Sequence, residues 1–175
     1  MINKIKDWFF YREMNQTAKK RNSRATGINL AQRINILFDG TDEEDRKTVH
    51  KFKKQLNPNQ KKTVKSLAFV NNDLPLDNVD YAAYNKKNLK WYGVPFGNKV
   101  VEFTALECDL MIVLSKNMLK HFEYIIAHSE AAFIVGPAIE HAEDYFDLII
   151  DFGETGNLEM MIKELVSGID TVATK

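Results

Sequence analysis

The chain has 175 residues, of which 45% are hydrophobic and 27% are charged, as in an ordinary folded domain of a globular protein. The chain has 24 lysines and arginines and 24 aspartates and glutamates, so its formal net charge is zero. This excludes a protein that is strongly basic or acidic overall, and the net charge favours no class of binding partner. Cys108 is the only cysteine, which excludes an intramolecular disulfide bond.

Residues 1–24 are predicted to form a basic amphipathic helix and a linker in front of a single α/β domain over residues 28–175. Apolar side chains recur at steps of three and four residues, which is typical of one helix face: Ile2, Ile5, Trp8 and Phe9. The segment carries seven basic residues against two acidic ones, a net charge of +5.

The apolar face of this helix needs a cover, because a row of large apolar side chains in water is unfavourable. We expect the cover to be protein: the helix's own domain, a second subunit of a homodimer, or another protein. A membrane surface is the alternative that a basic helix suggests. The basic residues cluster late, at Lys19–Arg24, instead of lining the polar face, which disfavours a membrane.

The apolar run at residues 8–11 is shorter than the core of a signal peptide, about 7–15 residues, or a membrane helix, about 20. We therefore expect a cytoplasmic protein.

The first half of the domain alternates strands with a helix. Residues 34–38 are predicted to form a strand that ends in Asp39–Gly40, and Thr41-x-x-Glu44 matches a capping box that opens a helix. Pro58 ends that helix. A second strand is expected over residues 64–70 and a short edge strand near 81–84, followed by an irregular stretch over 85–99.

The second half repeats this alternation. A brief helix is expected over residues 100–106, and the apolar run 110–114 is typical of a strand that is covered on both faces. Ser115 or Asn117 is predicted to cap the next helix. Two further strands are expected at 133–135, cut off by Gly136–Pro137, and at 146–150, with a last helix from Asn157.

This order predicts a three-layer α/β fold with a mostly parallel sheet and helices on both faces, in a Rossmann-like or flavodoxin-like arrangement. The runs 34–38, 110–114 and 133–135 should be neighbouring parallel strands. In such sheets ligands bind beyond the carboxyl ends of the strands, where the strand order reverses. Four segments follow strands in this way: Asp39–Thr41, Ser115–Asn117, Gly136–Pro137 and 151–156.

Asp39, Gly40 and Thr41 are the leading candidates for ligand binding, with Ser115 and Gly136 beside them. They place a carboxylate and a flexible glycine at the start of a helix, where free N–H groups can hold an anion. The four acidic residues at 42–45 would repel a phosphate unless a metal intervened. The competing interpretation is an ordinary helix start whose acidic residues complement the helix dipole.

Several familiar sites are excluded by single residues. The strand end resembles that of haloacid-dehalogenase-type phosphatases, with Asp39 in place of the second aspartate, but Leu37 occupies the position of the nucleophile. A calcium loop would need glycine where Glu44 stands and an acidic residue at His50. Glycine-rich nucleotide fingerprints are absent from the sequence. We therefore expect no metal, no cofactor and a buried thiol at Cys108.

Aromatic residues and lysines alternate over residues 81–99. This composition suits base stacking with phosphate contacts, or a loop that folds over a sheet edge with its aromatic rings inward. We favour the loop. As candidate interaction residues we name two from the first helix and two from this segment: Trp8, Phe9, Trp91 and Tyr92.

Four phrases together resemble an uncharacterised family of short Bacteroidetes-type bacterial proteins, a domain of unknown function. They are FDGTDEEDRKTVHKF, KKNLKWYGVP, FIVGP and YFDLIID. The similarity would cover residues 34–165. It implies a small three-layer α/β fold and no known activity.

Two functions remain open. The first is a binding or protein-interaction module without catalysis, and the second is an enzyme that binds a small molecule or phosphate ligand at the carboxyl ends of the strands. The absence of a complete catalytic set favours the first. Nucleic acid and membrane are not expected as partners, whereas a homodimer or protein partner through the first helix is.

Overall fold

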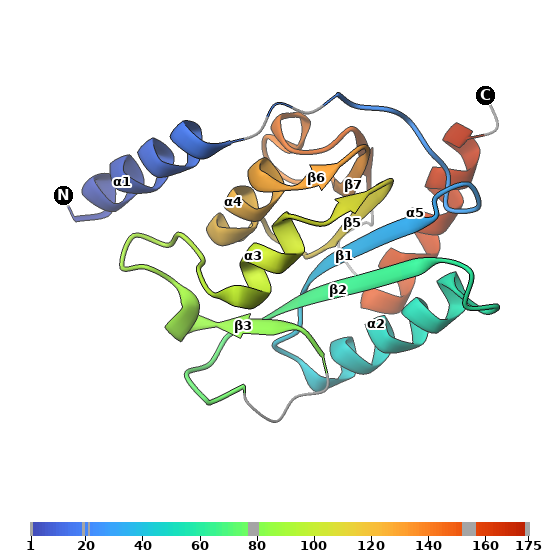
Figure 1. Cartoon of the computed structure of the whole chain (residues 1–175), viewed down its shortest axis with the longest axis horizontal. Coiled ribbons are helices and arrows are strands. Elements are labelled where there is room, and N and C mark those ends of the chain that lie inside the picture. The colour runs from blue at the N-terminus through green and yellow to red at the C-terminus, as the bar shows by residue number, and fades with distance from the viewer. Residues whose placement is uncertain (1, 19, 21, 77–80, 152–156, 174–175) are drawn as a thin grey trace.

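The computed structural model describes residues 2–18, 20, 22–76, 81–151 and 157–173 of the chain. Six strands form one parallel sheet in the order β3-β2-β1-β5-β7-β8 (Figure 1). This order confirms the predicted parallel α/β fold and is that of the doubly wound Rossmann type. No helix in this part of the chain is long and apolar enough to cross a membrane.

The elements have the following bounds. The strands of the sheet are β1 Arg33–Asp39, β2 Thr63–Val70, β3 Ala83–Asn85, β5 Leu110–Leu114, β7 Ile134–Pro137 and β8 Leu148–Ile150. The α-helices are α1 Ile2–Thr17, α2 Glu43–Leu56, α3 Asn98–Thr104, α4 Lys120–His128 and α5 Leu158–Ala173. The smaller elements are β4 Glu107–Cys108, which pairs with β6 Glu130–Ala131, and the 3-10 turns Lys86–Asn88 and Ala142–Asp144.

The three runs predicted to be neighbouring parallel strands are neighbours. Ile36 of β1 pairs with Ile112 of β5, and Ile112 pairs in turn with Val135 of β7. All three side chains are fully buried. Mainly apolar runs suit these positions because helices cover both faces of a central parallel strand, and Asn35 of β1 is a buried polar exception.

Two hydrophobic layers enclose the sheet. One layer packs α2 and α5 against it, and the other packs α3 and α4 against the opposite face. Cys108 is buried in the second layer. The strand order runs from β1 towards β3 in one direction and from β5 towards β8 in the other. The order therefore reverses between β1 and β5.

Several helix starts differ from the prediction. The cap of α2 is Asp42, whose side chain accepts a hydrogen bond from the Glu44 N–H at 2.9 Å. The predicted cap, Thr41, instead donates its hydroxyl to Asp39. Helix α4 begins after Leu119 without a side-chain cap. The hydroxyl of Ser115, one of the two predicted caps, donates to the Asn117 carbonyl. Short polar side chains have competing local partners, and sequence alone does not rank them.

The apolar face predicted for α1 is not the side that the domain covers. Phe10 is fully buried and lies against Tyr124 of α4, with ring centroids 6.5 Å apart. Ile2, Ile5 and Trp8 remain exposed. Figure 1 shows α1 beside α4 at one end of the molecule, away from α2 and α5.

A buried polar pair joins α4 to the edge strand β3. The Tyr84 hydroxyl shares a hydrogen bond of 2.6 Å with His121 Nδ1, and the imidazole ring packs on Phe69 with centroids 4.1 Å apart. Burial lowers the pKa of His121 to about 4 and raises the pKa of Tyr84 well above its usual value. Both groups are therefore neutral near neutral pH.

We expect His121 to make the fold less stable as the pH falls from about 6.5 to about 4. In this window the unfolded chain binds a proton that the folded chain does not, so the free energy of unfolding decreases by about 3 kcal/mol. Denaturant unfolding of Tyr84→Phe and of Tyr84→Phe/His121→Phe at about pH 7 and about pH 4.5 measures this effect. The double variant should lose less stability between the two pH values. Equal losses would contradict the assignment to His121.

Candidate functional site

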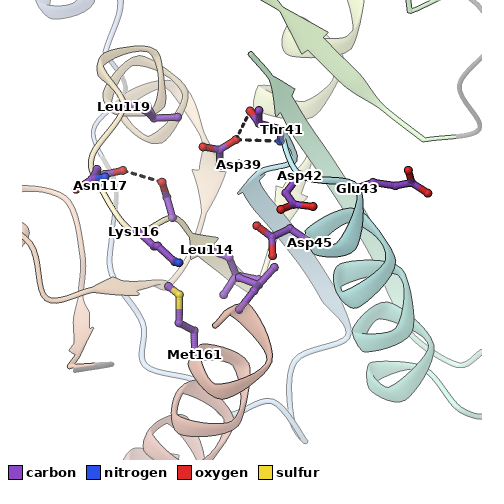
Figure 2. A pocket seen from close by; sticks show the side chains of 12 residues that line it. Asp39, Thr41, Asp42, Glu43, Asp45, Leu114, Lys116, Asn117, Leu119 and Met161 are labelled. Atoms are coloured by element: carbon purple, nitrogen blue, oxygen red, sulfur yellow. Dashed lines mark hydrogen bonds between the residues drawn. The ribbon is translucent and has the colours of Figure 1, made fainter. Parts of the chain in front are cut away.

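A crevice opens at the carboxyl ends of β1 and β5, where the strand order reverses (Figure 2). Its volume is about 590 Å³. Four carboxylates, one lysine, three other polar side chains and four apolar side chains line it. They are Asp39, Thr41, Asp42, Glu43, Asp45, Leu114, Ser115, Lys116, Asn117, Leu119, Leu158 and Met161.

The wall at the end of β1 is held by Asp39. Its Oδ1 accepts hydrogen bonds from the Thr41 N–H at 3.0 Å and from the Thr41 hydroxyl at 2.6 Å. The Thr41 hydroxyl in turn accepts from the Asn71 N–H at 3.0 Å, which ties this turn to the end of β2. The carboxylate thus has a fixed position at the edge of the crevice.

Gly40 lies directly behind this wall and is buried. A Cβ at this position would lie 3.0 Å from the Ala68 Cβ and 3.1 Å from the Phe38 ring. The glycine therefore allows the turn to pass close to β2. The structure gives it a packing role, and it does not line the crevice.

The start of α2 forms the acidic side of the crevice. The chain's own carboxylates occupy two N–H groups here: Asp42 binds the Glu44 N–H of α2, and Asp39 binds the Thr41 N–H of the turn before it. The Arg46 guanidinium donates hydrogen bonds to the Gly40 and Thr41 carbonyls, so this residue of α2 stabilises the turn. This helix start therefore offers fewer free donors than a phosphate-binding helix start would.

Asp45 is a half-buried carboxylate of the crevice. Burial raises its pKa, and the nearby charges of Asp42 and Asp39 raise it further, while Lys116 opposes them. Figure 2 shows the three aspartates gathered at this side, with Lys116 across from Asp45. A carboxylate in this position gains from any hydrogen-bond donor or positive charge that enters the crevice.

The wall at the end of β5 comes from residues 114–119. The Ser115 hydroxyl donates to the Asn117 carbonyl at 2.7 Å, and no histidine or carboxylate of the described residues bonds to it. Ser115 therefore lacks the base that activates a serine nucleophile. Leu114, Leu119 and Met161 supply apolar surface.

The carboxylates do not form a metal site. Among the residues that the structure describes, no group of three or more histidine, cysteine, aspartate or glutamate side chains is arranged to hold a metal ion.

The structure brings together most of the predicted ligand-binding residues. Asp39, Thr41 and Ser115 line one crevice, whereas Gly136 does not. Gly136 is buried in β7, where an added Cβ would lie 2.3 Å from the Phe146 ring. The candidate segment 152–156 lies outside the described residues.

The sequence analysis missed part of the lining. It gave Asp45 no role beyond the acidic helix start, and it placed Leu158 and Met161 only in the last helix. The four acidic residues at 42–45 follow closely on a predicted strand, and this local sequence pattern indicates the acidic wall. Nothing local indicates that α5 reaches the crevice, since that depends on the strand order.

The predicted interaction surface lies around α1 and the loop that precedes α3. The Phe9 ring lies 4.8 Å from the Trp8 ring, 5.3 Å from the Trp91 ring and 5.8 Å from the Tyr92 ring. Tyr92 donates its hydroxyl to Glu13, and Lys90 binds the same carboxylate at 2.6 Å. Burial acts to raise the pKa of Glu13, but the hydrogen bonds from Lys90 and Tyr92 outweigh it and lower this pKa. The four aromatic residues are therefore contiguous.

Substitution of Gly136 tests its packing role. Gly136→Ala should lower the free energy of unfolding by about 1–3 kcal/mol, because the new methyl group overlaps the Phe146 ring. In the background of Phe146→Leu the same change should cost less, and denaturant unfolding of the four proteins measures this coupling. An alanine that is tolerated in both backgrounds would contradict the packing explanation.

Comparison with known proteins identifies a family without a known function. The model of a family of unknown function (DUF6913) matches residues 4–167. No curated protein and no solved structure matches the chain. The match spans α1 and every strand of the sheet. The chain therefore belongs to DUF6913, a family of unknown function.

Proposed function

We propose that this protein binds a small polar molecule, rich in hydroxyl or amino groups, in the crevice between β1 and β5. The observation that carries the proposal is the position of the crevice at the reversal of the strand order. Doubly wound sheets bind their ligands at this point, because the two diverging loops leave a gap there.

The size and lining of the crevice support a small-molecule ligand. Its volume of about 590 Å³ lies within the range of such sites, about 300–1,000 Å³. Leu114, Leu119 and Met161 provide apolar contact, and polar groups on the opposite wall can fix the orientation of a ligand.

The charges support a ligand that donates hydrogen bonds. Among the described residues, four carboxylates and one basic residue, Lys116, line the crevice. Ionised carboxylates only accept hydrogen bonds, so they suit hydroxyl and ammonium groups. A phosphate would meet repulsion from Asp39, Asp42 and Asp45, and the N–H groups of Thr41 and Glu44 are already occupied.

The lining favours binding over catalysis. A nucleophile needs a base within hydrogen-bond reach, and Ser115 has none among the described residues. We therefore favour a binding protein of this kind over an enzyme that acts on a phosphate compound.

A ligand screen by thermal shift and calorimetry tests the proposal. Polyols, amino sugars and polyamines should raise the melting temperature, whereas sugar phosphates and nucleotides should not. Asp45→Asn should weaken the binding of a hit about ten- to hundredfold, since it removes a charge-assisted hydrogen bond.

The matched control is Glu44→Gln, one position away on α2. Glu44 pairs with Lys47 outside the crevice, so its loss should leave affinity unchanged. Binding of phosphate compounds alone, or equal affinity of Asp45→Asn and the unsubstituted protein for a hit, would overturn the proposal.

A further inference from the structure

We infer that the outer side of α1, together with Trp91, docks on an anionic lipid surface. We call the side chains concerned the outer apolar surface: Ile2, Ile5, Trp8, Phe9 and Trp91. This inference is independent of the ligand proposed for the crevice, and it departs from the protein cover that the sequence favours.

The fold leaves these side chains in water. Trp8 is 56% exposed, Trp91 is 59% exposed and Ile2 is 70% exposed. The packing of α1 on the domain uses the other side of the helix, through Phe10. The rings of Trp8, Phe9 and Trp91 follow one another in edge contacts, so the surface is continuous across α1 and the loop.

The charges of α1 are sorted between its two sides. Its two acidic residues face the domain: Asp7 pairs with Lys120 of α4, and Glu13 pairs with Lys90 of the loop. Lys4, Trp8 and Arg12 follow at steps of four residues and so form one row on the helix. The Arg12 guanidinium lies 5.1 Å from the centre of the Trp8 ring. The row beside the outer apolar surface is therefore basic and contains no acidic residue.

This sorting complements an anionic surface. A basic helix with tryptophan and isoleucine on its exposed side suits the plane of a membrane interface, where Lys and Arg side chains are attracted to anionic lipid. Tryptophan rings favour the headgroup level, since one edge is apolar and the N–H is polar. The segment after α1 adds the exposed Lys20 and Arg24.

A second copy of the chain fits this surface less well. A two-fold interface brings the same patch to itself, so Lys4 and Arg12 would face the like charges of their own copies. Five apolar side chains also fall short of the roughly 20–30 residues a side of a standard interface. Acidic lipid supplies the opposite charge without requiring a matching shape.

Intrinsic fluorescence tests the inference on the whole chain. Trp8 and Trp91 are its two tryptophans, so the emission reports on this surface alone. Vesicles of phosphatidylcholine with phosphatidylserine should shift the emission to shorter wavelength and co-sediment the protein. Vesicles of phosphatidylcholine alone should do neither, and salt should reverse the effect because it screens exposed charges.

Charge-reversal variants distinguish binding through this surface from a general electrostatic attraction of the protein to the vesicles. Lys4→Glu/Arg12→Glu should lower partitioning about tenfold or more, whereas Lys51→Glu/Lys54→Glu on α2 makes the same change in net charge and should not. Melting curves of both double variants check that the fold is intact, and neither midpoint should move. An unchanged emission with anionic vesicles would overturn the inference. So would a blue shift that depends on protein concentration without lipid, with a dimer mass by light scattering.

Discussion

The parallel pairing of β1 with β5 is the constraint on which the rest of the structure depends. Apart from the buried Asn35 of β1, both strands are apolar between their ends, and helices bury them on both faces. Because they are parallel and in register, with Phe38 opposite Leu114, they end at the same level. The first polar residues beyond them, Asp39 and Ser115, therefore meet at one edge, and the diverging connections leave the crevice there.

The same edge shows why a familiar strand order does not imply a familiar ligand. In phosphate-binding members of this architecture, the helix that follows the first strand presents free N–H groups to an anion. Here Asp42 occupies the Glu44 N–H of the helix, and Asp39 occupies the Thr41 N–H of the turn before it. Carboxylates of the chain thus take donors that an anion would use, and the lining of the crevice is acidic. Function must be argued from such side chains, since one fold supports many sites.

Helix α1 is attached to the domain mainly by polar contacts around one buried ring. Phe10 is buried, while Lys120 and Lys90 bind the two acidic residues of the helix. Exposed ion pairs of this kind contribute little stability each, and their positions agree with the side of the helix that Phe10 turns towards the domain.

Local patterning determined the strands, their parallel arrangement and the polar residues that follow them. Short, mainly apolar runs between turn residues are typical of strands buried on both faces, so the strands near residues 34–38 and 110–114 and their ends at Asp39 and Ser115 were predictable. Only the tertiary structure decided that α5 lines the crevice and that Phe10, instead of Trp8, is the buried ring of α1. Periodicity cannot select between two apolar sides of a helix. The partners that meet the inner side of α1 are distant in sequence: Tyr124 lies against Phe10, and Lys90 and Lys120 lie 77 and 113 residues from their acidic partners, so they become neighbours only in the folded chain.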